Sequence, residues 1–263
     1  VFVPVYFGYE RVVESATYVS ELSGKPKEKE SLLGMLKTLR VVREKFGRVH
    51  VNLGEPIALD EVLARAAPDW RARGAENDAR TPWLAPVVDE LAGRIMRNIN
   101  SAAAVTPVNL LALTLLATPR QTMLREDLLR QLELYLALLA AVPYGPRVTV
   151  ASETPEAILA YGEAMKMVTR EPHKLGDVVR MSEASAVLSA WYRNNILHLY
   201  AMPSLIACAF VGHSIMRTED IHRLVWRIYP YIAAELFIRW SEEEIPAVTD
   251  AVLAALAARG LVT

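Results

Sequence analysis

Two long stretches without any charged residue set the strongest limit on how this chain can fold. They are residues 98–119 and 196–216, and each is long enough to cross a bilayer as a helix. Each also contains polar groups, such as Asn109 in the first and His198 in the second, which are costly in hydrocarbon unless they are hydrogen-bonded. The sequence therefore favours buried core helices, with membrane-embedded helices as the alternative.

The charge balance and the cysteine content narrow the class of protein. The 29 basic and 30 acidic residues give a net charge of -1, so there is no basic excess of the kind that nucleic-acid binding requires. The single cysteine, Cys208, cannot form an internal disulfide, which indicates a reducing compartment. Because the five histidines are scattered and Cys208 is alone, we expect neither a metal site nor a cofactor.

The N-terminal part has the pattern of β-strands. Residues 1–7 are β-branched and aromatic, which predicts a buried strand. Residues 48–53 alternate, with Val49, Val51 and Leu53 on one face, which predicts a half-buried strand. The chain starts directly on a strand and without an initiator methionine, so we expect the natural N-terminus to lie upstream.

The pattern changes after a polar, turn-rich segment. Residues 67–82 are interpreted as a linker between an α/β segment, residues 1–66, and a helical region, residues 83–263. The fold class is therefore α/β followed by mostly α. Prolines separate the expected helices, which cover residues 83–99, 102–117, 123–141, 154–168, 182–200, 204–216, 219–239 and 242–259.

Four short blocks suggest a family. They are PVYFGYE at residues 4–10, VNLGEP at 51–56, YRNNILHLYAMPSLI at 192–206 and ELFIRWSEEEIP at 235–246. Each block is weak alone, but the order and spacing of all four resemble the membrane-associated bacterial glycerol-3-phosphate 1-O-acyltransferases. The resemblance covers nearly the whole chain.

The resemblance implies a function in phospholipid biosynthesis. Such an enzyme transfers a fatty acyl group from acyl-CoA or acyl-ACP to glycerol 3-phosphate, at the cytoplasmic side of the cell inner membrane. The implied partners are these substrates and the membrane surface, without nucleic acid. The family's catalytic H-x-x-x-x-D motif is absent from this sequence, so we assign no catalytic residue and expect the chain by itself to be inactive.

The resemblance also implies substrate-binding residues. The first block is implied to bind glycerol 3-phosphate, and Gly-Glu-Pro of the second to shape the acyl-donor or active-site wall. The alternatives are ordinary strand packing, a strand-ending turn and, for the third block, a polar network between helices. The candidates from these blocks are Pro4, Tyr6, Tyr9, Glu10, Gly54, Glu55, Pro56 and Arg193.

A lysine-containing loop supplies two more candidates. Lys27 and Lys29 alternate just before a helix that Ser31 can cap, and a helix N-terminus favours a phosphate. The neighbouring residues Glu28 and Glu30 offset this charge, so a solvated loop is the alternative interpretation.

A function of another class also fits part of the chain. The helix pattern at residues 123–141 and the C-terminal sequence ALAARGLVT resemble pieces of winged-helix proteins, which would indicate a non-enzymatic interaction module. A nucleic-acid-binding version would need a basic, exposed second helix within residues 105–150.

Overall fold

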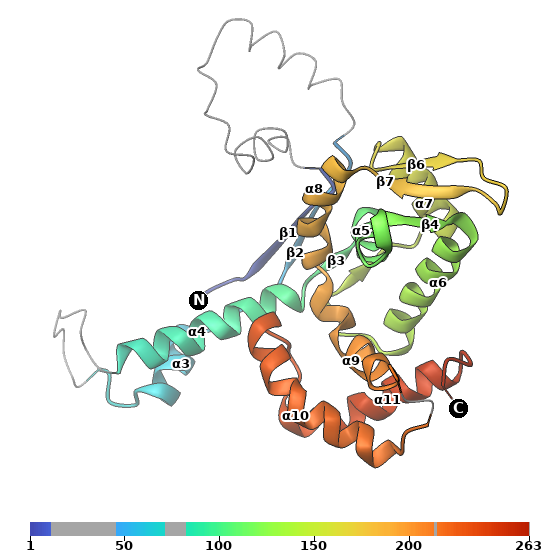
Figure 1. The fold of residues 1–263 in the computed structure, drawn as a ribbon. Helices are drawn as coiled ribbons and strands as arrows, with labels where there is room; N and C mark the ends of the chain where they lie inside the picture. The colour runs from blue at the N-terminus through green and yellow to red at the C-terminus, as the bar shows by residue number, and fades with distance from the viewer. Residues whose placement is uncertain (12–45, 72–82, 213–214, 263) are drawn as a thin grey trace, which may run out of the picture.

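The computed structural model describes residues 1–11, 46–71, 83–212 and 215–262. The loop with Lys27 and Lys29 and most of the predicted linker lie outside these residues. The structure begins with a two-stranded hairpin and continues as a mainly helical body (Figure 1). This confirms the predicted fold class.

Short strands form three small sheets. The hairpin pairs β1 (Val5–Tyr9) with β2 (Val49–Leu53). A second sheet pairs β3 (Ala104–Val105) in parallel with β5 (Thr149–Val150). The third has the order β4-β7-β6, from β4 (Thr122–Leu124), β6 (Val168–Glu171) and β7 (Val178–Met181).

The helices confirm the predicted helical region, with boundaries shifted by a few residues. Four differences are larger. The helix expected at 102–117 begins only at Pro107, and those expected at 154–168, 182–200 and 204–216 end at Ala164, Asn194 and Ala209. The α-helices are α3 (Leu59–Ala66), α4 (Leu84–Asn100), α5 (Pro107–Leu116), α6 (Arg125–Ala141), α7 (Pro155–Ala164), α8 (Glu183–Asn194), α9 (Ala201–Ala209), α10 (Thr218–Leu236) and α11 (Ile245–Ala257). Short 3-10 turns are Pro119–Gln121, Leu197–Tyr200 and Glu242–Glu244.

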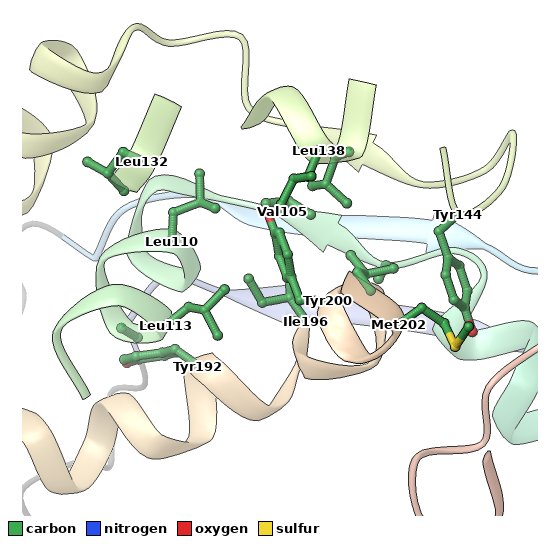
Figure 2. Packing of buried hydrophobic residues seen from close by; sticks show 14 of the residues in the cluster. Val105, Leu110, Leu113, Leu132, Leu138, Tyr144, Tyr192, Ile196, Tyr200 and Met202 are labelled. Carbon is green, nitrogen blue, oxygen red and sulfur yellow. The ribbon is translucent and has the colours of Figure 1, made fainter. Parts of the chain in front are cut away.

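The first uncharged stretch and the beginning of the second lie in the core of the helical body. Every residue of α5 from Pro107 to Leu115 is buried. Side chains from the second stretch, such as Ile196 and Tyr200, pack in the same core as Leu110 and Leu138 (Figure 2). Within the described residues, no helix combines the length and the apolar character needed to span a bilayer.

The buried polar groups of Asn109 and His198 are satisfied inside the protein. Asn109 forms a capping box with Thr106 at the start of α5, and its Nδ2 donates to the Tyr192 carbonyl oxygen over 2.8 Å. His198 Nε2 lies 3.0 Å from the carbonyl oxygen of Asn100. Since hydrogen bonds offset the cost of burying polar groups, these residues are compatible with a core position.

The alternative of a nucleic-acid-binding winged-helix module would need a basic, exposed second helix within residues 105–150. The second helix of residues 105–150, α6, lacks the basic face that nucleic-acid binding requires. In α6 the first turn carries Glu126 and Asp127, and Asp127 forms an ion pair with Arg130. The described structure therefore gives no support to a nucleic-acid-binding function.

The orientation of β2 differs from the prediction of a half-buried strand. Its side chains alternate as expected, but Val49, Val51 and Leu53 are each more than half exposed. The polar side chains His50 and Asn52 face the helical body instead. The reason is that the body offers hydrogen-bonding partners at this junction rather than an apolar surface: Asn52 Nδ2 donates to the Ala102 carbonyl oxygen at 2.9 Å.

Candidate substrate-binding site at the hairpin

The first two sequence blocks form the two strands of the hairpin. The strands are antiparallel, with Val5 opposite Leu53 and Tyr9 opposite Val49. Their inner face contacts the helical body through Tyr6, whose hydroxyl lies 3.4 Å from the carbonyl oxygen of Ala104. Burial raises the pKa of Tyr6 to about 12, so this hydroxyl stays protonated and donates.

Glu10 is the centre of the junction between the hairpin and α7. It is only 3 % exposed, although ionised carboxylates are rarely buried without partners. Its Oε2 accepts from the backbone N–H of Arg48 at 2.6 Å and from the hydroxyl of Tyr161. Burial, and then the hydrogen bond to Glu10, raise the pKa of Tyr161 to about 12, so Tyr161 is the donor.

Gly47 allows the residues just before β2 to lie close to Glu10. Its φ of +72° lies in the left-handed region, which glycine adopts without steric cost. A Cβ at this position would lie 2.6 Å from Glu10 Oε2. The next residue, Arg48, forms a 2.9 Å ion pair with Glu153, which ties the hairpin to the segment before α7.

The second carboxylate oxygen of Glu10, Oε1, accepts no hydrogen bond among the described residues, unlike Oε2. Glu10 Oε1 and His50 Nε2 are 3.7 Å apart, and both are buried atoms without a hydrogen-bond partner among the described residues. A buried carboxylate oxygen without a donor is unfavourable.

A small cavity of about 120 Å³ lies beside Glu10. Arg11 and Lys166 bring two positive charges to its wall, and Ser185 and Ser189 bring two hydroxyls. Lys166 has φ 58°, a left-handed conformation that is uncommon for residues with a side chain. The cations and hydroxyls of this wall can hold a small polar anion.

The Gly-Glu-Pro segment after β2 lies against α4. A Cβ at Gly54 would lie 2.6 Å from the Asn98 carbonyl oxygen and 3.2 Å from Cβ of Pro4, which explains the glycine. Glu55 is exposed and forms an ion pair with Arg147, and Pro56 follows it. The structure thus brings Pro4, Gly54 and Glu55 together about one helix end, at the opposite end of the hairpin from Glu10.

Two other candidates lie apart from the Glu10 junction. Tyr9 is 41 % exposed and belongs to the outer face of the hairpin. Arg193 is on the end of α8, where its guanidinium donates to the side chain of the adjacent Asn194. His198, which was expected within a helix at 182–200, is instead buried on a separate 3-10 turn.

Sequence reasoning missed the partners of Glu10. His50 could have been found, because its alternation in the strand predicts a side chain on the same face as Asn52. Tyr161 is 151 residues away from Glu10 along the chain, and no local pattern indicates that it approaches Glu10.

Comparisons with known proteins define the class of this chain. Residues 18–263 match the family model described as the glycerol-3-phosphate acyltransferase C-terminal region. The glycerol-3-phosphate acyltransferase of Pseudomonas paraeruginosa is 45 % identical over 261 residues, which are 99 % of this chain and 31 % of that protein. That of Xanthomonas campestris pv. campestris is 47 % identical over 243 residues, 92 % of this chain and 27 % of the relative.

The chain therefore belongs to the glycerol-3-phosphate acyltransferase family. It spans about three-tenths of the length of the curated relatives it matches. The matched part corresponds to the region that the family describes as C-terminal.

Proposed function

We propose that this chain acts as the C-terminal part of a glycerol-3-phosphate 1-O-acyltransferase. In this function a fatty acyl group passes from acyl-CoA or acyl-ACP to the sn-1 hydroxyl of glycerol 3-phosphate and gives 1-acyl-glycerol 3-phosphate. The observation that carries the proposal is the 45 % identity over 99 % of the chain to proteins named for glycerol-3-phosphate acylation.

In such a protein, substrate binding and proton abstraction fall to different parts of the sequence. A glycerol hydroxyl is a poor nucleophile, so acyl transfer needs a general base that removes its proton during attack. The H-x-x-x-x-D motif that supplies this base in the family is absent from the sequence. We therefore assign substrate binding, and not proton abstraction, to the residues of this chain.

The Glu10 junction is the place that suits glycerol 3-phosphate. A glycerol hydroxyl can donate to the unpartnered Oε1 of Glu10, and Arg11 and Lys166 provide positive charge for the phosphate. The small volume of the adjoining cavity, about 120 Å³, fits the phosphate end of the substrate rather than an acyl chain. In this assignment the acyl donor approaches from outside the described residues.

The hairpin fits the role of an edge of the acyltransferase domain, which we assign to residues 1–66. The outer face of the hairpin, formed by Phe7, Val49, Val51 and Leu53, is more than half exposed at each of these residues. An apolar sheet face in water is unfavourable and prone to association. Packing of the rest of a longer acyltransferase against this face would remove that cost.

The outer side of α10 supports attachment to the cytoplasmic face of the inner membrane. Ile221, Val225 and Tyr229 are buried at intervals of four residues. The opposite side carries Trp226, which is 52 % exposed, and Tyr231, which is 78 % exposed. Aromatic rings of this kind settle at the headgroup level of a bilayer.

Arginines lie between these rings on the exposed side of α10. They are Arg223, which is paired with Asp220, and Arg227. A basic and aromatic helix side of this composition attracts anionic lipid. Vesicle co-sedimentation tests this assignment: Arg227→Gln should weaken binding to phosphatidylglycerol vesicles about fivefold. Arg65→Gln on α3 is the control, and equal effects of the two changes would refute the assignment.

The proposed enzymatic function is tested by kinetics. Acyl transfer from palmitoyl-CoA to glycerol 3-phosphate is measured for the 263-residue chain and for a longer acyltransferase that contains it. Only the longer protein should be active. In that protein Glu10→Gln should raise the KM for glycerol 3-phosphate at least tenfold without changing the KM for palmitoyl-CoA. Glu163→Gln on α7 is the matched control. Activity of the 263-residue chain alone, or an unchanged KM in Glu10→Gln, would contradict the proposal.

A further inference from the structure

A much larger cavity lies in the helical body, between α6, α9 and α11. Its volume is about 850 Å³, which is within the range of small-molecule binding sites, about 300–1,000 Å³. The side chains of Leu134, Leu138, Phe210 and Leu253 form much of its wall. None of its lining residues belongs to the Glu10 junction.

The lining of this cavity selects for an uncharged, apolar occupant. Among the described residues, no lining side chain carries a formal charge. Its few polar groups include Gln131, Ser204 and Thr218, and the Tyr200 hydroxyl is already used in a 3.3 Å hydrogen bond to the Tyr135 carbonyl oxygen. A phosphate or carboxylate inside the cavity would lack a charged partner, which is strongly unfavourable. A hydrocarbon chain has no such cost.

A polar hollow adjoins the cavity and carries charge. It shares Gln131, Leu134 and Leu261 with the cavity, and Arg130, Arg259, Asp127 and Glu133 also line it. Asp127 forms an ion pair with Arg130. In the described part of the chain Arg259 forms no ion pair, so it is the cation that remains for a ligand beside the apolar cavity.

We propose that the cavity and the hollow together bind one single-chain anionic amphiphile. Its hydrocarbon chain fills the cavity, and its anionic head lies at Arg259. Such a ligand would also cover Ile215, which is 88 % exposed at the cavity wall, and Leu261, which is 52 % exposed. This site is separate from the glycerol 3-phosphate site proposed at Glu10.

The length of the ligand chain gives the first test. Octanoate, decanoate and dodecanoate are titrated calorimetrically into the 263-residue chain, below their micelle concentrations. Burial of each methylene should tighten binding about fourfold, so each step of two methylenes should tighten it by about tenfold or more. An affinity independent of chain length would overturn the proposal.

Two exposed alanines on α11 provide a matched pair of variants. Ala254 lines the cavity and Ala251 does not. Ala254→Trp should weaken dodecanoate binding at least tenfold by filling the cavity, whereas Ala251→Trp should change it less than twofold. If Ala254→Trp does not fold, Ala207→Leu on α9 replaces it as the cavity-filling variant. Equal effects of the lining and control variants would overturn the site.

The head position is tested separately with Arg259→Gln. This change should weaken dodecanoate about fivefold, because an exposed charge-assisted hydrogen bond is lost, and leave dodecanol unchanged. If Arg259→Gln weakens the binding of both ligands, or of neither, the role of Arg259 is overturned.

Comparison of dodecanoate with 1-dodecanoyl-glycerol 3-phosphate identifies the source of the ligand. The compound that binds more tightly shows whether a free fatty acid or an acyl-glycerol phosphate occupies the site. Only the assignment of an acyl-glycerol phosphate rests on the proposed function. If neither binds, the proposal is overturned. Because binding is the readout, failure of this inference and failure of the acyltransferase proposal are distinguishable.

Discussion

The hairpin and the helical body differ in where their apolar side chains lie: buried in the body and exposed on the hairpin. In the body, side chains such as Leu110, Leu111 and Leu128 are completely buried in one continuous core. In the hairpin the apolar side chains point outward, and Val51 and Leu53 are 54 % and 59 % exposed. The hairpin turns its polar side chains toward the body instead.

This difference shows which of the two regions forms a closed core from this chain alone. The body closes its core with its own helices, so its stability should come from packing within the chain. The hairpin is held on the body by polar contacts such as those of Glu10 with Tyr161 and of Asn52 with Ala102. Its outward apolar face has the composition of an interaction surface.

The largest effect is expected from the body core. Leu128→Ala removes a side chain with no exposed surface, and such cavity-forming changes cost about 2–5 kcal/mol of unfolding free energy. Urea denaturation followed by circular dichroism measures this cost. A loss below about 1 kcal/mol would mean that the body core is loosely packed, and the contrast with the hairpin would fail.

The second effect is a pH dependence of the body. Burial lowers the pKa of His198 to about 4, although its hydrogen bond to Asn100 opposes the shift. The unfolded chain therefore binds this proton more readily, and stability should fall as the pH drops from about 6.5 to about 4, by about 3 kcal/mol in total. Urea denaturation across this range should show a weaker dependence in His198→Gln than in the control His222→Gln. Identical slopes in the two variants would contradict the prediction.

The helical body was largely predictable from local pattern. Periodic apolar positions and prolines locate most of the helices, and the uncharged stretch around Asn109 was correctly expected to form a core helix. The three-stranded sheet of β4, β6 and β7 was missed because its strands have only three or four residues. Strands so short carry too little alternation to be separated from helix ends.

The candidate site was predictable only in part. Glu10 and Tyr6 are in a block that could be singled out from the sequence, but Tyr161 approaches Glu10 across 151 positions of the chain. Local pattern also fixes which side chains share a face of β2, and not which face meets the body. That choice depended on carbonyl groups such as that of Ala102, which accepts from Asn52.

A smaller effect is expected where the hairpin meets the body. The hydrogen bond between Tyr161 and Glu10 should contribute about 1 kcal/mol to docking of the hairpin, because the acceptor is charged but Tyr161 is partly exposed. A double-mutant cycle of Glu10→Gln and Tyr161→Phe measures this coupling. The readout is hydrogen exchange of the β1 and β2 amides. Coupling near zero would show that other contacts hold the hairpin.

The smallest effect on stability, and the one that separates the two regions most clearly, is expected on the outer face of the hairpin. Val51→Ser should change the unfolding free energy by no more than about 0.5 kcal/mol, because the side chain buries little surface within this chain. The same change should reduce self-association of the isolated chain, measured by analytical ultracentrifugation, because it interrupts an exposed apolar face. In a longer acyltransferase that contains the chain, Val51→Ser should instead cost more than 1 kcal/mol, since the serine hydroxyl would be buried without a partner. Equal small costs in both proteins would show that the hairpin face stays exposed in the longer protein.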